Sequence, residues 1–331
     1  PLSAKNWTDV YGGKLDPRMP YRQLLPSGKH IDLFFYDGPI AQGVAFEGIL
    51  NRGEDFAHRL VGPLDEAPEK PQLVHIATDG ETYGHHHRYG DMALAYALDY
   101  IERDPTISLT NYGEYLEKFP PENEVQIEEN TSWSCAHGVE RWQSNCGCHS
   151  GAHPGWNQEW RKPLRQALDA IRDDLAIRYQ DEAAKLLKYP WAARDEYIEL
   201  VLDRSPQVRQ AFLKRHAINV LDAEQAMRAA KLLELQRNAM LMYTSCGWFF
   251  DDLSGIETVQ VIAYAGRVIQ LAQQLFGDHI EEKFLTSLEQ AESNLPKEGN
   301  GRQIYEKYVR PAFVDLHRVG AHYVISSLFQ D

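Results

Sequence analysis

Two acidic residues and three histidines lie close together in the stretch from Gln72 to Gly90. A short apolar run at its start is typical of a buried strand, and a helical pattern begins at Asp91. Asp79 and Glu81 turn the chain between these two elements. Because α/β folds place their chemistry at the carboxyl ends of strands, we predict a functional site at this turn. The alternative is that Asp79 only caps the helix and that the histidines form a solvated face.

The spacing of Asp79 and Glu81 is compatible with general acid catalysis. Two carboxyl groups in a confined site disfavour each other's charge, so one of them can stay protonated near neutral pH. Glycoside cleavage needs such an acid and a second carboxylate, which lies about 5–5.5 Å away in retaining enzymes and about 6.5–9.5 Å away in inverting ones. Spacing does not choose between six candidates for this second group: Glu81, Asp37, Glu128, Glu129, Asp251 and Asp252.

The loop 130–160 combines tryptophans, cysteines and histidines in an unusual proportion. A loop of this length is usually functional or disordered, and its aromatic content argues against disorder. Its tryptophans could stack on sugar rings, or they could pin the loop to its own domain, and the sequence leaves both interpretations open. They are Trp133, Trp142, Trp156 and Trp160.

The cysteines of this loop have the spacing of a metal or redox site rather than of a disulfide framework. Cys146, Cys148 and His149, with Cys135 and His137 upstream, offer soft ligands for a structural zinc ion. The alternative is a set of reduced, packed cysteines. We expect no cofactor to be required.

A second polar break, at residues 244–255, interrupts a long helical region. Trp248, Asp251 and Asp252 are unusual residues for a simple connector, so we predict that this break also contributes to the site. The chain contains no P-loop, G-x-G-x-x-G, nucleophile elbow or H-E-x-x-H motif.

Composition describes an ordinary globular protein of 331 residues, with 43% hydrophobic residues and a net charge of −14. This charge argues against nucleic acid or an anionic membrane surface as the main partner. No apolar run is long enough for a membrane span, and the start has no signal core, so we expect a cytoplasmic protein. Because the sequence lacks an initiator Met, we expect it to be a fragment or a processed form.

Apolar runs predict strands at 31–36, 72–77, 107–110 and 125–128, with helices between them. This order is typical of parallel βα units and could be the second half of a barrel. From Trp160 onward the pattern is helical. The predicted helices span about 163–179, 181–203, 206–217, 222–244, 256–276, 278–293 and 302–328. We therefore expect two domains, an α/β domain over 1–160 and an α-helical bundle domain over 161–331.

Several motifs resemble glycoside hydrolase family 57. The stretch TDGETYGHHH, Thr78–His87, resembles the family's fourth signature region, in which the aspartate of a D-x-E-x-x-G pattern is the general acid. NTSWSCAHGVERW, Asn130–Trp142, resembles its fifth region. IDLFFYDGPIAQGVAF, residues 31–46, is similar to the segment before the fourth region, and TSCGWFFDD to the family's Trp-containing break. Together, "DGE" and "NTS" resemble the module called domain of unknown function 3536.

The resemblance implies the closing strands of a (β/α)7-type barrel followed by a helical domain. It implies retaining hydrolysis or transglycosylation of α-glucans, with Asp79 as general acid and Glu81 beside it. Residues that would bind substrate are Asp37, His85, His86, Trp133, His137, Trp142, Trp248, Asp251 and Asp252. The family's first three regions, including the one with the nucleophile, would precede Ile31, and no residue there resembles them. We therefore expect an N-terminal partner or domain to supply the nucleophile.

Two other functions remain compatible with the sequence. One is a non-catalytic carbohydrate-binding or metal-stabilised accessory module, and the other is a relative that has lost activity.

Overall fold

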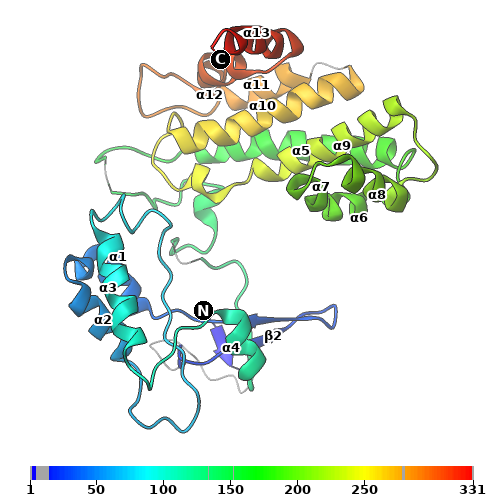
Figure 1. Cartoon of the computed structure of the whole chain (residues 1–331). Coiled ribbons are helices and arrows are strands. Elements are labelled where there is room, and N and C mark those ends of the chain that lie inside the picture. The colour runs from blue at the N-terminus through cyan, green and yellow to red at the C-terminus, as the bar shows by residue number, and fades with distance from the viewer. Residues whose placement is uncertain (1, 5–14, 133, 152, 278–279, 330–331) are drawn as a thin grey trace. The chain divides into compact units, whose positions relative to one another are not determined.

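The structure is a computed structural model that describes residues 2–4, 15–132, 134–151, 153–277 and 280–329. The chain divides into two compact units, Pro1–Glu129 and Asn130–Asp331 (Figure 1). The loop 130–160 thus lies in the same unit as the helices that follow it. The expected domain boundary after residue 160 stays a prediction.

The first unit contains a small mixed sheet of four strands in the order β1-β4-β2-β3. The strands are β1 (Leu2–Ala4), β2 (Tyr21–Leu24), β3 (His30–Leu33) and β4 (Asn123–Ile127). β2 pairs antiparallel with β3 and parallel with β4, and β1 pairs antiparallel with β4. The prediction of four parallel strands is therefore wrong for the described residues. β1 and β2 precede residue 31, where no strand was predicted.

Two of the predicted strands are extended segments that form no strand ladder in the described chain. Residues 72–77 and 107–110 have no strand assignment. The segment 72–77 makes two isolated main-chain hydrogen bonds, both at 2.9 Å. Leu73 N donates to Arg18 O, and His75 O accepts from Asp37 N. Both segments line a hollow of about 800 Å³. The strand-like apolar pattern is present, but the neighbouring strands that would satisfy its backbone are not among the described residues.

Four α-helices complete the first unit: α1 (Gly38–Phe46), α2 (Gly53–Val61), α3 (Gly90–Glu102) and α4 (Tyr112–Lys118). Asp37 and Asn111 cap α1 and α4 through their side chains, as their positions before these helices predict. α2 and α3 pack against each other and against the short helix η1 (Ile49–Asn51). Their core is small and consists of Val44, Leu50, Phe56, Ala57, Ala93 and Ala97.

The second unit is helical. Its α-helices are α5 (Arg161–Ala183), α6 (Pro190–Glu196), α7 (Ile198–Leu202), α8 (Pro206–His216), α9 (Ala223–Leu241), α10 (Ile256–Phe276), α11 (Ile280–Leu288), α12 (Gly301–Ile304) and α13 (Leu316–Ser327). Short 3₁₀ turns are η2 (Glu140–Trp142), η3 (Ser245–Trp248) and η5 (Arg310–Ala312), and η4 (Tyr305–Val309) is a π-helical turn.

Most predicted helices of this unit are present, and two are broken. The predicted helix 181–203 is divided because Pro190 begins α6, and proline lacks the N–H that a continuous helix needs. The predicted helix 302–328 is divided by η4 and by η5, which contains Pro311. Among the described residues, no helix is long and apolar enough to cross a membrane.

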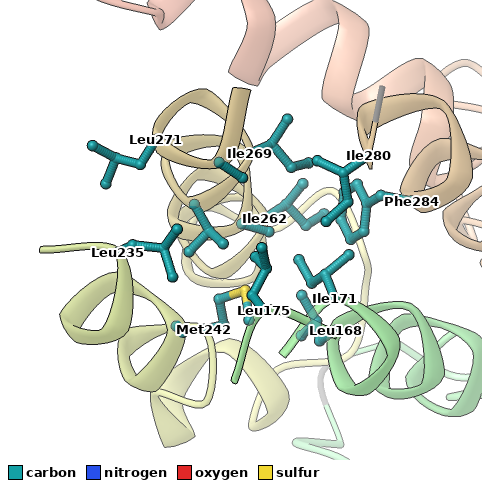
Figure 2. Packing of buried hydrophobic residues seen from close by; sticks show 14 of the residues in the cluster. Leu168, Ile171, Leu175, Leu235, Met242, Ile262, Ile269, Leu271, Ile280 and Phe284 are labelled. Carbon is teal, nitrogen blue, oxygen red and sulfur yellow. The ribbon is translucent and has the colours of Figure 1, made fainter. Parts of the chain in front are cut away.

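One extensive core holds the helical unit together. α5 contacts α9 and α11, and α10 contacts α9. Leu168, Ile171, Ile262 and Phe284 point toward one another between these helices (Figure 2). Buried residues recur mostly at three- and four-residue steps along α5, and mostly as adjacent pairs at that spacing along α10, so each helix has one apolar face toward the core.

The break between α9 and α10 is pressed closely against α10. A Cβ atom on Gly247 would lie 2.3 Å from Val261 Cγ2, so only glycine fits there. This approach inserts Trp248, which is 1% exposed, into the core. The break therefore serves the packing of the helical unit.

Candidate functional site

The acidic stretch of the first unit forms a tight series of turns between residue 78 and α3. Asp79 O accepts from Thr82 N at 3.1 Å, and Glu81 O accepts from His85 N at 3.1 Å and from His86 N at 3.0 Å. Thr82 is buried, whereas the side chains of Asp79 and Glu81 are exposed. The backbone thus fixes the turn while both carboxyl groups stay open to solvent. α3 begins at Gly90, so Asp79 does not cap it.

The histidine turn is anchored to the small core of the same unit. Tyr83 and His87 form an isolated β-bridge, and the Tyr83 ring lies 6.5 Å from that of Phe56. Gly90 packs so closely that a Cβ there would lie 3.3 Å from Tyr83 Cα and 3.4 Å from His87 Cβ. His85 and His86 are exposed, with ring centroids 5.3 Å apart. Their exposure and common turn leave both rings accessible beside the acidic pair.

Asp37 has a structural task in this unit. Its Oδ1 accepts from Ile40 N at 2.9 Å and so caps α1. Beside it, His75 contacts Tyr112 through Nδ1 and the phenol oxygen at 3.0 Å. Burial lowers the pKa of His75. The sequence pattern did not single out His75 or Tyr112, because each reads as part of a strand or a helix start.

The predicted tryptophans have different environments. Trp133 lies outside the described residues. Trp142 is half-buried, and its Nε1 donates to Ser245 O at 3.3 Å, while Trp248 is buried beside Trp160, with ring centroids 6.3 Å apart. Trp160 thus pins the loop to the core, as one of the two interpretations of the loop tryptophans predicted, and Trp248 pins the break. Binding of substrate by Trp248 stays a prediction. Whether Trp142 binds substrate stays a prediction.

A hollow of about 390 Å³ in the helical unit is lined by Trp156, which the predicted site did not include. The Trp156 ring stacks on His153 at a centroid distance of 3.9 Å. Asn294 Oδ1 accepts from Asn157 N, and its Nδ2 donates to Asn157 O, both at 2.9 Å. An aromatic face beside amide groups is a combination that can bind a sugar ring.

Asp251 and Asp252 are buried and fully engaged within the helical unit. Ser150 donates to Asp251 from its amide at 2.8 Å and from its hydroxyl at 2.5 Å. Asp252 accepts from the amide and hydroxyl of Ser254 at 2.8 and 2.6 Å, and from Asn294 N at 2.6 Å. These contacts tie three loops together. They give both carboxylates a structural task, and their binding of substrate stays a prediction.

Acid should remove the stabilisation that Asp252 provides. Burial opposes its ionisation, but hydrogen bonds from Ser254, Ser293 and Asn294 outweigh burial and hold its pKa below the usual range. A lowered folded-state pKa stabilises the fold fully above the unfolded value of about 3.9, and the contribution is lost as pH falls through the folded pKa.

We therefore expect Asp252→Asn to lower the free energy of unfolding by about 1–3 kcal/mol at neutral pH. The difference from wild type should shrink below a pH of about 4. Urea denaturation at several pH values measures it, with the exposed Asp181→Asn on α5 as control. A difference that stays constant into acid would contradict this assignment.

Four possible metal ligands meet in the loop 130–160. One donor atom from each of Cys135, His137, Cys146 and Cys148 lies within 4.8 Å of all the others. His149 is not in this group, and its Nδ1 accepts from Gly151 N at 2.9 Å. The group therefore contains His137, which the sequence offered as a possible metal ligand and the family resemblance as a substrate-binding residue, and it does not contain His149.

Comparisons with known proteins agree with the motifs. Residues 156–331, more than half of the chain, match the family model described as domain of unknown function (DUF3536). The chain belongs to this DUF3536 family. Residues 7–128 match the model of glycosyl hydrolase family 57, so the resemblance to that family is confirmed as well. No protein with a curated description matches the sequence.

Among solved structures, the chain is similar to an exo-type maltose-forming amylase from Pyrococcus sp. ST04, with a TM-score of 0.62 and 13% sequence identity. The match covers 93% of this chain and 62% of the amylase, so the chain spans less than two thirds of the amylase's length. At this identity the likeness concerns the fold, which in this DUF3536 chain is rich in helices and has one small sheet.

Proposed function

We propose that this chain is part of a retaining glycoside hydrolase or transglycosylase that acts on α-glucans. The observation that carries the proposal is the turn Thr78–His87, which has the D-x-E-x-x-G pattern and lies within the segment matched by glycosyl hydrolase family 57. Its backbone is fixed by hydrogen bonds, and its two carboxyl groups are exposed.

In this proposal Asp79 is the general acid. It donates a proton to the glycosidic oxygen as the bond to the anomeric carbon breaks, and a carboxylate on the opposite face of the sugar attacks that carbon. Glu81, His85 and His86, on the same turn, hold the hydroxyl groups of the sugar. Asp79 then takes a proton from the incoming water or sugar hydroxyl, which restores the acid.

The attacking carboxylate is proposed to come from a polypeptide segment outside these 331 residues. The segments 72–77 and 107–110 have the apolar composition of buried strands, yet they line a hollow and form no ladder in the described chain. Additional strands beside them would satisfy their backbone and complete a barrel. The amylase match, which spans 62% of that protein, leaves room for such a segment.

A second candidate function is binding of carbohydrate by the helical unit. The hollow beside Trp156 favours it, because an aromatic ring and the polar groups of Asn157 and Asn294 border the same space. This function would need no nucleophile.

The deciding experiment measures turnover of soluble starch and maltooligosaccharides by this chain alone and by this chain mixed with a family 57 segment carrying the first three signature regions. Activity only in the mixture would support the proposed enzyme. Activity of the chain alone would contradict an external nucleophile and direct attention to Glu81. No turnover in either case, with sugar binding that Trp156→Ala weakens, would favour the binding module.

A further inference from the structure

We infer that Cys135, His137, Cys146 and Cys148 form a structural zinc site in the helical unit. Thiolate and imidazole are the ligands that structural zinc prefers, and three cysteines with one histidine are a common closed set. All four donors come from the loop 130–160, which contains only one short 3₁₀ turn among its described residues.

Three of the six distances between the donor atoms match those of a tetrahedral zinc site, and all six are within 4.8 Å. Zinc bound at about 2.3 Å from sulfur and about 2.0–2.1 Å from nitrogen places two sulfurs about 3.8 Å apart, and a sulfur and a nitrogen about 3.5–3.6 Å apart. In the structure, Cys135 Sγ lies 3.8 Å from Cys146 Sγ and 3.8 Å from Cys148 Sγ. Cys148 Sγ lies 3.6 Å from His137 Nδ1. The cysteines are free thiols, so no disulfide accounts for this closeness.

The backbone brings the donors together through tight turns. Ser132 and Cys135 form an isolated β-bridge, and the Ser132 hydroxyl donates to Gly138 O at 2.7 Å. Gly138 has a φ of +78°, and a Cβ there would lie 2.4 Å from Asn130 O. Gly147, between the other two cysteines, has a φ of +83°. Both glycines adopt a conformation that other residues rarely allow.

Two buried arginines place positive charge close to the proposed site, which would itself be negatively charged. Zinc with three thiolates and a neutral imidazole carries a net charge of −1. Arg161 is 0% exposed and donates to Cys148 O at 2.9 Å, and Arg141 is 4% exposed and packs on the Phe249 ring. Among the described residues, no carboxylate lies within 4.0 Å of either guanidinium. The Asp251 carboxylate already acts electrostatically on Arg161. A negatively charged metal centre would add to this compensation of two buried cations.

The site would have a stabilising task. All four positions of a tetrahedral ion are taken by protein atoms, which is the mark of structural rather than catalytic zinc. Through Arg161, the first residue of α5, the metal would connect the loop to the helical core. This inference does not depend on the proposed glycosidase activity.

The first test is the metal content of the full chain, purified from medium that contains zinc and analysed by plasma mass spectrometry. We expect one zinc ion per chain that persists through gel filtration. After removal of the metal with a chelator, Co²⁺ should give thiolate-to-metal charge-transfer bands and the visible absorption of tetrahedral cobalt. Substoichiometric zinc together with no such bands would overturn the inference, and both measurements use the wild-type chain.

The ligand set is tested by two matched pairs of variants. His137→Ala should weaken zinc affinity by more than about ten-fold, whereas His149→Ala should not. Cys146→Ser should likewise weaken binding, whereas Cys246→Ser, at an exposed cysteine outside the group, should leave it unchanged. Equal effects within either pair would overturn the assignment. If a ligand variant fails to fold, the cobalt spectrum of the wild type still decides whether three thiolates bind.

Discussion

When this chain carries Asp79→Asn and is mixed with the family 57 segment, turnover of maltooligosaccharides is expected to fall by about 10²–10⁴-fold. The fold should stay intact. The amide has nearly the shape of the acid but cannot donate a proton to the departing glycosidic oxygen. Because Asp79 is exposed and its side chain makes no hydrogen bond to the described residues, the substitution should not alter stability by more than about 0.5 kcal/mol. This expectation rests on the proposed function.

The leaving group distinguishes loss of the acid from a general loss of binding. In an aryl α-glucoside with an acidic phenol, the phenolate can leave without much protonation. Turnover of this substrate by the variant should therefore fall far less than turnover of maltotetraose. Asp91→Asn, an exposed acid in the first turn of α3, is the control and should leave both rates unchanged. Equal losses on both substrates, or full activity of Asp79→Asn, would show that another group donates the proton.

Replacing Trp248 with alanine should lower the free energy of unfolding of the helical unit by about 3–5 kcal/mol. The indole is 1% exposed, packs beside Trp160 and is held by the close approach of Gly247 to α10. Its removal would leave a cavity at the point where η3 joins α9 to α10. Urea denaturation followed by far-UV circular dichroism reports the change, because helices dominate that signal.

The control for Trp248→Ala is Tyr189→Ala, which removes an aromatic ring that is 74% exposed. It should change the free energy of unfolding by no more than about 0.5 kcal/mol. A Trp248→Ala chain that unfolds within about 1 kcal/mol of wild type would contradict the structural task assigned to this residue, and would return Trp248 to the candidates for substrate binding.

The sequence predicted helices better than strands for a physical reason. The helices α9 and α10 follow from local periodicity and from end signals such as the Asp222–Gln225 capping box. Strand pairing is not local, so the apolar runs at 72–77 and 107–110 could not reveal whether a partner strand exists. β2, with the sequence YRQL, has too little apolar alternation to be recognised.

The candidate metal ligands show what local spacing leaves open. The C-x-C-H order favoured His149, which follows Cys148 directly. In the structure the chain leaves the cysteine turn with His149 bonded to Gly151, and the turn around Gly138 brings His137 to the sulfur atoms. Only the folded loop could decide between the two histidines. Asp79 and Glu81, by contrast, are candidates on residue type and motif alone, and their catalytic roles stay predictions.

The unequal cores of the two units have a consequence for hydrogen exchange. Amide groups exchange through local opening, and the free energy of that opening follows the amount of packed apolar surface that must separate. The helices around Ile171 and Ile262 open only when an extensive cluster comes apart, whereas the core of α2 and α3 has six buried side chains with partly buried neighbours. The backbone beneath the acidic turn therefore belongs to the faster-exchanging part of the molecule. Any molecule that covers the hollow beside residues 72–77 would slow exchange there first.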